Sequence, residues 1–530
     1  MPSLVLDLDA PADTVARVAR EVLDGRIGAP AGTGSAGDAA EVEVPFQSGD
    51  PVRVYLRWGP GPAGAGTRVE VESEPAPPVP YFSWFVRPIL RSAGRRAVAY
   101  VGAALRAGIA GEPAPPPPRR PPLAPPATFD STQAILLATV CAIAAVATFG
   151  GSLLSQNVDY VGKSFGASDR ALGTALAISR FGVLIALVAS AMADRRGRRR
   201  LLLISFAGVC LANAVAALAP NLAVFTAGQV LMRGFVNTAL VVSGIAAIEE
   251  APDGARAYSL ALLGLAGGMG YALGVLLLPT ADLGAEAWRA SFALSAASVL
   301  LLPSFARHLA ETQRYAGLAA REAKRGQVAE VFDPSYGSRF GVLVVASFLF
   351  SIFAAPTSQF TNRYLADQRG FSGLDITVFR AITQGLPGVA GVIIGGRLAE
   401  TRGRRPVATL ALFAGTLANM VFLLYGGLTL WLSSAGAIVL GGIATPALGA
   451  FNGEMFPTEI RGTANAMLLV AGVTGSVVGL LVTGSLSGRW GLGQALAFTG
   501  IPSLFAAALL IPRLPETAFR SLDEVSPSEV

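Results

Sequence analysis

Long apolar segments recur through most of the chain, each about twenty residues long and nearly free of charged residues. Because an α-helix rises about 1.5 Å per residue, about twenty apolar residues cross the hydrocarbon core of a bilayer. The pattern therefore predicts an all-α polytopic membrane protein with twelve transmembrane helices. The predicted spans are 132–157, 170–193, 200–219, 222–248, 256–280, 288–306, 339–361, 374–399, 406–427, 430–453, 462–485 and 491–512.

The first 111 residues follow a different pattern. The segments SLVLDLDA, VRVYLRW and TRVEVESE alternate apolar and polar positions, whereas ADTVARVAREVLDG carries apolar residues at helical spacing. This pattern predicts a small soluble α+β domain over residues 1–111. The order of strand, helix, strands and closing helix resembles the helix-grip domains of the START and SRPBCC type, in which a C-terminal helix closes over a curved sheet.

The closing helix of this domain begins with aromatic residues and continues with arginines. These residues are Phe82, Trp84, Phe85, Arg87, Arg91, Arg95 and Arg96. Such a helix could lie in the membrane interface, where aromatic and basic side chains gather. It could equally form the packed core and the solvated face of an ordinary helix, and the sequence leaves both interpretations open.

Proline marks the end of the soluble domain. Residues 112–128 are rich in proline and predict an extended, semi-rigid linker of about 3 Å per residue. The rest of the chain then divides into a six-helix bundle over 129–306, a polar cytoplasmic linker over 307–338, a second six-helix bundle over 339–512 and a cytoplasmic tail over 513–530.

Composition removes several classes of function. Charged residues make up 14% of the chain, whereas soluble proteins carry about 25%. The only cysteines, Cys141 and Cys210, lie in apolar runs, and the single histidine is His308, so no disulfide framework, metal site or histidine-based triad is expected. Since no nucleophile accompanied by a base and no phosphate-binding loop is visible, we expect no enzyme activity and no cofactor.

The net charge of +6 does not indicate a nucleic-acid partner, because the arginines gather in short loops between spans, where they set membrane topology. Three basic loops fall on one side of the membrane if both termini are cytoplasmic. The N-terminus lacks the pattern of a cleavable signal peptide. We therefore expect a multi-pass protein of a bacterial-type inner membrane, with the lipid bilayer and a small-molecule solute as partners. The basic residues are Arg195, Arg196, Arg198, Arg199, Arg200, Arg307, Arg314, Arg321, Lys324, Arg325, Arg402, Arg404 and Arg405.

Three motifs occur twice in the membrane region at a nearly constant shift. MADRRGRRR matches LAETRGRRP at a shift of 206 residues, EEAPDGAR matches EMFPTEIR at 205, and LAET matches LPET at 205. The motifs follow the second, fourth and sixth span of each half. A repeat of this kind indicates that two six-helix halves arose from one duplicated unit.

The first two motifs predict a gate on the cytoplasmic face. Glycine at 197 and 403 allows a sharp turn between two helices, and carboxylates lie close enough to arginines for charge-assisted pairing across the loops. Such ionic networks could hold the cytoplasmic side shut; the alternative is that the charges only anchor topology. The predicted gate residues are Asp194, Arg195, Gly197, Arg198, Arg199, Glu249, Arg256, Glu400, Gly403, Arg404, Arg405, Glu454 and Arg461.

On these motifs the chain, over about residues 130–525, resembles the major facilitator superfamily. SAMADRRGRR and GRLAETRGRR are similar to the signature loop of that family, and NGEMFPTEIRGTA and LPETAFRSLDEV are similar to its sugar-porter and metabolite-porter branches. The resemblance implies a monomeric carrier in which two helix bundles rock about a central site. It implies alternating-access transport of a small organic solute, such as a sugar or a carboxylate.

Polar residues inside spans are the candidates for the solute site. They are Arg180, Arg233, Asn237, Gln359, Gln384 and Asn452. Arg380 also fits such a site, but it lies near the outer end of its predicted span, where a long side chain can instead snorkel to the interface. If three arginines faced one cavity, they would favour an anionic solute such as a carboxylate.

Proton coupling has one candidate, because the first span contains no acidic residue. Asp159 follows that predicted span, and we expect an ordinary loop charge there or, in a proton symporter, the coupling carboxylate. The fifth span lacks the G-P-x-x-G-G pattern of the family's drug antiporters, which favours uptake. Export of drugs or metabolites remains an alternative, and so does a non-transporting sensor that signals through the N-terminal domain.

Overall fold

The computed structural model describes residues 2–516 except 22, 24–25, 28–38, 48–49, 62–65, 122–123, 187–196, 253–254, 312–333 and 455–457. The side chains of some further helical residues, among them Glu400, Asn452, Glu454 and Arg461, also lie outside the description. The chain forms two compact units. Unit 1 comprises Met1–Ala144, Ser243–Ala266 and Ser304–Ala316, and unit 2 comprises Ala145–Val242, Gly267–Pro303 and Gly317–Val530.

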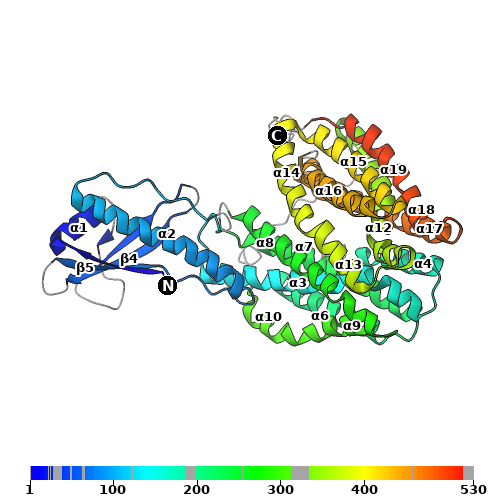
Figure 1. The fold of residues 1–530 in the computed structure, drawn as a ribbon, viewed down its shortest axis with the longest axis horizontal. Helices are drawn as coiled ribbons and strands as arrows, with labels where there is room; N and C mark the ends of the chain where they lie inside the picture. The colour runs from blue at the N-terminus through cyan, green and yellow to red at the C-terminus, as the bar shows by residue number, and fades with distance from the viewer. Residues whose placement is uncertain are drawn as a thin grey trace. The chain divides into compact units, whose positions relative to one another are not determined.

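The N-terminal part of unit 1 is the predicted α+β domain. Its sheet is antiparallel, with five strands in the order β1-β5-β4-β3-β2, and α2 lies across one face of it (Figure 1). The elements are β1 (Ser3–Leu8), α1 (Ala12–Glu21), β2 (Arg26–Ile27), β3 (Ala39–Val44), β4 (Val52–Pro60), β5 (Thr67–Ser73) and α2 (Ser83–Ala110).

Apolar and polar side chains alternate along the strands, so one face of the sheet is apolar and is covered by the helices. Leu56 on β4 and Val71 on β5 are fully buried against Val101 and Leu105 of α2. The opposite face of the sheet carries exposed charged residues that pair between neighbouring strands. The domain therefore has two layers, with its apolar core between the sheet and the helices.

The proline-rich segment is tied to the loop between β3 and β4. Gln47 N donates to Pro118 O at 3.2 Å, and Asp50 N donates to Pro126 O at 2.8 Å. Arg120, within the proline-rich segment, donates to Asp50 O of the loop at 3.0 Å and to Pro126 O of its own segment at 2.8 Å. The segment is thus docked on the domain along part of its length, and its reach is shorter than a fully extended linker would give.

Eleven helices among the described residues are long and apolar enough to cross a membrane. They agree with eleven of the twelve predicted spans. The remaining one, predicted over 170–193, begins as α4 (Asp169–Ser179) and continues into residues outside the description. The eleven are Ser131–Ser164, Arg198–Ala217, Leu222–Glu249, Tyr258–Leu283, Trp288–His308, Gly337–Arg369, Gly373–Ala399, Arg404–Leu424, Leu428–Leu448, Met467–Trp490 and Leu492–Arg513.

Several spans are made of more than one helical element. The elements of the first half are α3 (Ser131–Ser164), α4, α6 (Arg198–Ala217), α7 (Leu222–Glu249), α8 (Arg256–Leu276), η2 (Leu278–Leu283), α9 (Trp288–Ala297), η3 (Ser298–Leu301) and α10 (Leu302–His308). Those of the second half are α12 (Pro334–Arg369), α13 (Gly373–Arg380), η5 (Ala381–Gly385), α14 (Leu386–Arg402), α15 (Arg404–Leu424), α16 (Leu428–Glu454), α17 (Thr458–Trp490), α18 (Leu492–Phe498), α19 (Gly500–Phe505), η6 (Ala506–Leu510) and η7 (Ile511–Arg513).

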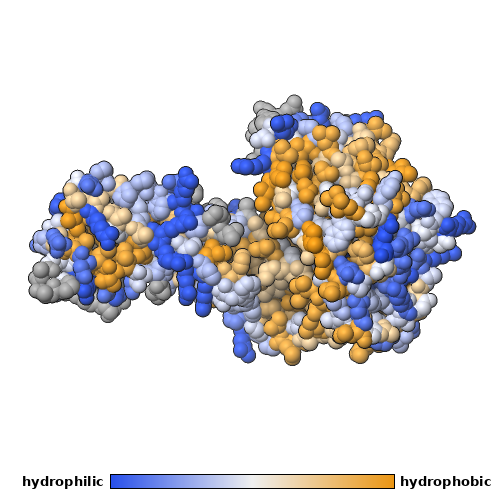
Figure 2. All heavy atoms as spheres, viewed as in Figure 1, coloured by the Kyte–Doolittle hydropathy of each residue, from blue (hydrophilic) through white to orange (hydrophobic). Residues whose placement is uncertain are grey.

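The surface of the helical region is apolar where lipid would contact it. Leu300, Leu386 and Leu410 are 81%, 85% and 70% exposed. Figure 2 shows apolar side chains gathered on the surface over α14, α15 and α16. A soluble protein does not expose apolar patches of this extent, whereas lipid-facing helices do.

Glycines at equivalent positions of the two halves let the same helix pairs approach closely. A Cβ at Gly270 of α8 would lie 1.9 Å from Ala145 O of α3, and a Cβ at Gly475 of α17 would lie 2.1 Å from Phe348 O of α12. Gly270 and Gly475 differ by 205 residues, which is the shift of the sequence repeat. The duplication therefore extends from the loop motifs to the packing of the first helix of each half against the fifth.

Candidate functional site

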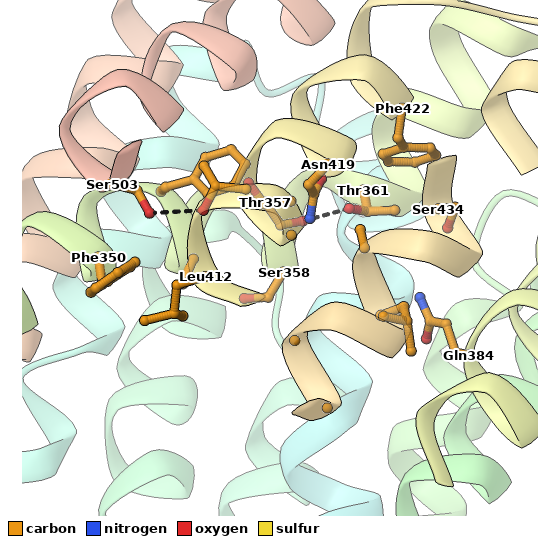
Figure 3. Close-up of a pocket in the computed structure, with 18 of the residues that line it drawn as sticks. Phe350, Thr357, Ser358, Thr361, Gln384, Leu412, Asn419, Phe422, Ser434 and Ser503 are labelled. Carbon is orange, nitrogen blue, oxygen red and sulfur yellow. Dashed lines mark hydrogen bonds between the residues drawn. The ribbon is translucent and has the colours of Figure 1, made fainter. Parts of the chain in front are cut away.

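A cavity of about 470 Å³ opens between helices of the second half in unit 2 (Figure 3). Its volume is within the range of small-molecule sites. Side chains from α12, α15 and α16 form most of the wall, with contributions from α13, η5, α19 and one residue of α8. The polar and aromatic lining residues are Tyr271, Phe350, Phe353, Thr357, Ser358, Thr361, Arg380, Gln384, Thr416, Asn419, Phe422, Ser434 and Ser503.

The eighth span is irregular beside this cavity. Its α-helix α13 passes into the π-helical turn η5, and α14 begins at Leu386 with Pro387 in its first turn. Proline lacks a backbone N–H and cannot donate to the preceding turn, so it favours a break in the helix here. Arg380 directly precedes the π turn, Gln384 lies within it, and both line the cavity.

The sequence left Arg380 open between a cavity residue and a snorkelling side chain. The structure places it in the cavity wall, where only 5% of the residue is exposed. Its guanidinium donates to Asn362 Oδ1 at 2.8 Å, to Tyr271 Oη at 2.5 Å and to Gln384 Oε1 at 3.3 Å. No carboxylate pairs with it within the described part of the chain. Burying a cation among neutral groups costs free energy, because the cation loses its hydration without gaining an opposite charge. An anion in the cavity would supply that charge and lower the free energy of the site.

The network around Arg380 joins the two halves. Tyr271 belongs to α8 of the first half, and Asn362 donates from α12 to Gln156 of α3, to its backbone O at 2.9 Å and to its Oε1 at 3.0 Å. A solute that accepts a hydrogen bond from Arg380 would therefore replace one of these bonds and weaken the contact between the halves.

The rest of the cavity offers hydrogen-bonding groups and flat apolar walls. Thr357 Oγ1 and Asn419 Oδ1 are buried without a hydrogen-bond partner among the described residues. Asn419 and Thr361 point toward one another in Figure 3, and Phe422 lies beside them. Thr416 and Ser503 are joined by a hydrogen bond of 3.1 Å. The lining can thus receive a ring that carries hydroxyl groups.

A second cationic site lies in the first half. α4 ends at Ser179, and the chain turns at Arg180 before helical structure resumes at Gly182. A Cβ at Gly182 would lie 3.1 Å from Arg233 Cβ of α7, so the two helices approach closely at this level. The guanidiniums of Arg180 and Arg233 repel one another, and the Nε atom of each is buried without a hydrogen-bond partner in the described structure. Of the predicted arginines, these two lie together, while Gln384 lies in the cavity of the second half with Arg380.

An ion network occupies the end of unit 2 at which α12 finishes, which we name the Arg363 end. Arg363 binds Asp159 Oδ1 at 3.4 Å and Asp169 Oδ1 at 2.7 Å, and Lys163 binds Asp159 Oδ2 at 2.7 Å and Asp367 Oδ1 at 3.1 Å. Asp159 and Lys163 belong to α3, Asp169 to α4, and the other two to α12. The network therefore ties the first half to the second.

Asp159 is thus not the loop charge that we expected from the sequence. It lies within α3, which continues to Ser164, and its side chain is only 3% exposed. The predicted span ended at 157 because hydropathy detects the apolar part of a helix alone. The last turns remain helical since their charged side chains find partners on the other half.

The turns at Gly197 and Gly403, one in each half, both belong to unit 2. Gly197 and Gly403 adopt φ values of +87° and +94°, which only glycine takes without strain. Glu516, in the LPET motif, accepts bonds from the backbone N–H groups of Arg404 at 2.9 Å and Arg405 at 3.1 Å. It caps the first turn of α15 as a carboxylate at a helix N-terminus does.

The predicted gate can be followed only in part. Arg198, Arg199, Glu249 and Arg256 each have an interaction partner, and Arg198 is buried. Asp194 and Arg195, and the side chains of Glu400, Glu454 and Arg461, lie outside the described residues. The gate therefore stays a prediction.

Two other predicted cavity residues, Asn237 and Gln359, do not line this cavity. Asn237 is half-buried on α7, Gln359 is buried on α12 with its Oε1 unsatisfied among the described residues, and the side chain of Asn452 lies outside the description. Sequence reasoning missed Arg363, Asn362 and Glu516. Only Glu516 had a signal, because it lies in a repeated motif; nothing local separates the other two from neighbouring polar residues.

Proteins of known family are similar in sequence to the membrane region of this chain. The sequence profile of the Major Facilitator Superfamily matches residues 140–438 and 381–526, so the α+β domain lies outside it. A gallate transporter of Pseudomonas putida is 28% identical over 395 residues, covering 66% of this chain and 84% of that protein. A probable 4-methylmuconolactone transporter of Cupriavidus pinatubonensis is 26% identical over 358 residues, covering 64% and 80%. The transcription regulatory protein OpdE of Pseudomonas aeruginosa is 27% identical over 393 residues, covering 73% and 94%.

Solved structures share the fold of the membrane region. The inward open xylose transporter XylE from E. coli superposes with a TM-score of 0.60 at 16% identity, covering 74% of this chain and 99% of that one. The human organic anion transporter MFSD10 superposes with a TM-score of 0.51 at 19% identity, covering 71% and 99%. With the duplicated six-helix halves and their repeated loops, these matches establish that the chain belongs to the Major Facilitator Superfamily and is a multi-pass membrane transporter, not an enzyme.

Proposed function

We propose that this transporter takes up small organic carboxylates that carry a hydroxylated or unsaturated ring, with Arg380 binding the carboxylate. The observation that carries the proposal is a buried guanidinium in a cavity wall with no carboxylate partner among the described residues. A neutral sugar would leave this cation uncompensated, whereas a carboxylate would form a charge-assisted, bidentate pair with it.

The remaining lining supports a ring as the rest of the solute. Phe350, Phe353 and Phe422 supply flat apolar surface, and Thr357 and Asn419 supply the unsatisfied polar atoms that ring hydroxyls require. The relatives described as gallate and 4-methylmuconolactone transporters support the same chemical class.

Solute binding at Arg380 would be coupled to movement of the two halves. In the described structure Arg380 donates to Tyr271 of the first half and to Asn362, which bonds Gln156 of the first half. A bound carboxylate would compete for these donors and weaken the bonds between the halves. Occupancy would thereby lower the barrier to rocking, which is what a carrier that moves mainly when loaded requires.

The test is flux into proteoliposomes that contain the purified protein. We expect uptake of gallate and related hydroxybenzoates but not of xylose or uridine. Arg380→Gln should reduce initial uptake by roughly 10-fold to 100-fold, because a hydrogen-bonded charge pair contributes about 1.5–3 kcal/mol. Arg380→Lys should restore part of it, and Arg489→Gln, which removes an exposed arginine of α17, is the matched control. Equal gallate uptake by Arg380→Gln and the control would contradict the proposal.

We further propose that protons drive this uptake through Asp159. Its carboxylate is buried between Lys163 and Arg363 at the junction of the halves. Protonation would remove the acceptor that holds Arg363 to α3 and release this end of the bundle. In the proposed topology, with both termini cytoplasmic and the protein monomeric, the Arg363 end faces outward. Asp159→Asn should abolish accumulation driven by an inward proton gradient while counterflow without a gradient persists; gradient-driven accumulation by Asp159→Asn would rule out this role.

The ionic gate on the opposite face belongs to the same proposal. The repeated loops that contain Gly197 and Gly403 would close the cytoplasmic side when the Arg363 end opens. Asp194→Asn and Arg461→Gln should each lower flux at equal surface expression, and unchanged flux would leave those charges with a topological role only.

A sensor is the second candidate function, and one observation favours it. Tyr81, at the start of α2, is hydrogen-bonded to Ser304 and His308 of α10, so the soluble domain contacts the end of a membrane span. The relative described as a transcription regulatory protein supports this alternative. Binding of a hydroxybenzoate without any flux, in protein of verified orientation, would favour the sensor over the carrier.

A further inference from the structure

The outer face of α2 combines one exposed tryptophan with a row of exposed arginines. Trp84 is 67% exposed, and Arg87, Arg91 and Arg95 are exposed as well. Their spacing of three, four and four residues places them along one stripe of the helix. The opposite stripe, which includes Ala97 and Val101, is buried against the sheet, so the arginine stripe does not contact the domain core.

The charge on this stripe is not balanced. α2 contains no acidic residue, and no carboxylate in the described parts of the chain pairs with Arg87, Arg91 or Arg95. On the outer face of the sheet, by contrast, Arg68 pairs with Asp7 at 2.8 Å. One side of the domain is thus internally neutralised, and the other presents unpaired positive charge.

The start of α2 is held at the end of a membrane span. Tyr81 Oη lies 2.7 Å from Ser304 Oγ and 3.1 Å from His308 Nδ1, and its ring packs edge-on against Phe305 at 5.3 Å between centroids. These three residues belong to α10, with which the span Trp288–His308 ends. Tyr81 adopts a φ of +67°, an unfavourable value for a residue with a side chain, and the contacts with α10 compensate for it.

The position of Trp84 follows from this contact. It lies three residues after Tyr81, in the first turn of α2, and so close to the level at which the sixth span leaves the bilayer. Tryptophan is enriched at that level because its ring is amphipathic, and arginines on the same stripe would meet lipid phosphates.

We propose that the stripe formed by Trp84, Arg87, Arg91 and Arg95 binds the head groups of anionic phospholipids in the leaflet around the sixth span. Each arginine near an anionic surface strengthens binding about fivefold, so three together supply a factor on the order of 100. The lipid thereby holds α2, and with it the α+β domain, against the membrane.

The experiment uses the full-length protein in nanodiscs of phosphatidylcholine alone or with 30% phosphatidylglycerol, a fraction of the lipids being brominated. Bromine quenches nearby tryptophans, and the difference between wild type and Trp84→Phe isolates Trp84 from the other four tryptophans. We expect Trp84 to be quenched at least twofold more strongly in the anionic discs.

Three comparisons decide the result. The triple variant Arg87→Gln, Arg91→Gln and Arg95→Gln should lose the dependence on phosphatidylglycerol, whereas Arg57→Gln, an exposed arginine on the outer face of the sheet, should keep it. In wild type, raising the salt from 0.05 M to 0.5 M should reduce the quenching, since screening shortens the reach of these charges. Equal quenching of Trp84 in neutral and anionic discs, or a triple variant that behaves like wild type, would overturn the proposal. If the triple variant does not fold, the salt series on wild type decides.

Discussion

Removing the charge of Arg363 is the sharpest perturbation of the contact between the two halves. The guanidinium is 12% exposed and bridges Asp159, which is 3% exposed, and Asp169, which is 25% exposed. Breaking a buried ion pair costs about 3–5 kcal/mol, whereas an exposed pair contributes about 0–1 kcal/mol. Since Lys163 still neutralises Asp159 after the substitution, we expect Arg363→Gln to destabilise this closed end by about 2 kcal/mol, or roughly 30-fold in its equilibrium with the open form.

The cavity can report on this equilibrium because the native cysteines are hidden. Cys141 and Cys210 are 4% and 1% exposed, so a single cysteine introduced at Ser358, which lines the cavity, can be labelled selectively. A membrane-impermeant thiol reagent added to intact cells should react with this cysteine at least 10-fold faster in Arg363→Gln than in the parent.

The control and the pairing test use matched substitutions. Arg489→Gln removes an equal charge from an exposed position of α17 and should leave the labelling rate unchanged. Asp169→Asn should accelerate labelling less than Arg363→Gln, and the double variant should show less than the sum of the two effects in free energy, because both remove one interaction. Additive effects, or an unchanged rate in Arg363→Gln, would refute the role of this network in closing the Arg363 end.

Three further outcomes can be measured, the first from the yield of folded protein and the other two by thermal unfolding. Gly270→Val should lower the yield of folded protein severely, because a Cβ there would lie 1.9 Å from a backbone oxygen of α3, whereas Gly264→Val on the same helix meets open space and should be tolerated. Glu516→Ala should lower stability by about 1 kcal/mol, since the first two backbone N–H groups of α15 lose their acceptor; no shift in the midpoint would contradict its capping role. The hydrogen bond from Arg289 holds the pKa of Glu286 below its ordinary value of 4.5, so Glu286→Gln should unfold at lower temperature than wild type above that pH, and the difference should vanish as the pH falls through the folded-state pKa.

Much of the architecture can be predicted from short stretches of the sequence. Apolar runs of about twenty residues are visible without any knowledge of the fold, since each span must satisfy its own backbone hydrogen bonds in lipid. The duplicated loops were equally visible, because Gly197 and Gly403 meet the same backbone requirement at the same place in two copies. These features predicted the helical membrane body, its two halves and the family.

The ends of helices were the weak point of this reasoning. Predicted spans stopped at 157 and 361, whereas α3 continues to Ser164 and α12 to Arg369. The extra turns carry the charged residues of the network at the Arg363 end. Hydropathy counts them as loop, because it cannot register that Asp159 and Arg363 neutralise each other across the two halves.

The sequence by itself determined the composition of each element: which segments enter lipid, which face of each strand is apolar, and that one six-helix unit was copied. Only the tertiary structure decided which polar residues meet. Arg380, Asn362 and Tyr271 come from three helices separated by up to about a hundred residues, and their hydrogen bonds depend on how those helices pack. A buried charge is acceptable or costly according to its neighbours in space, and no spacing along the chain reveals those neighbours.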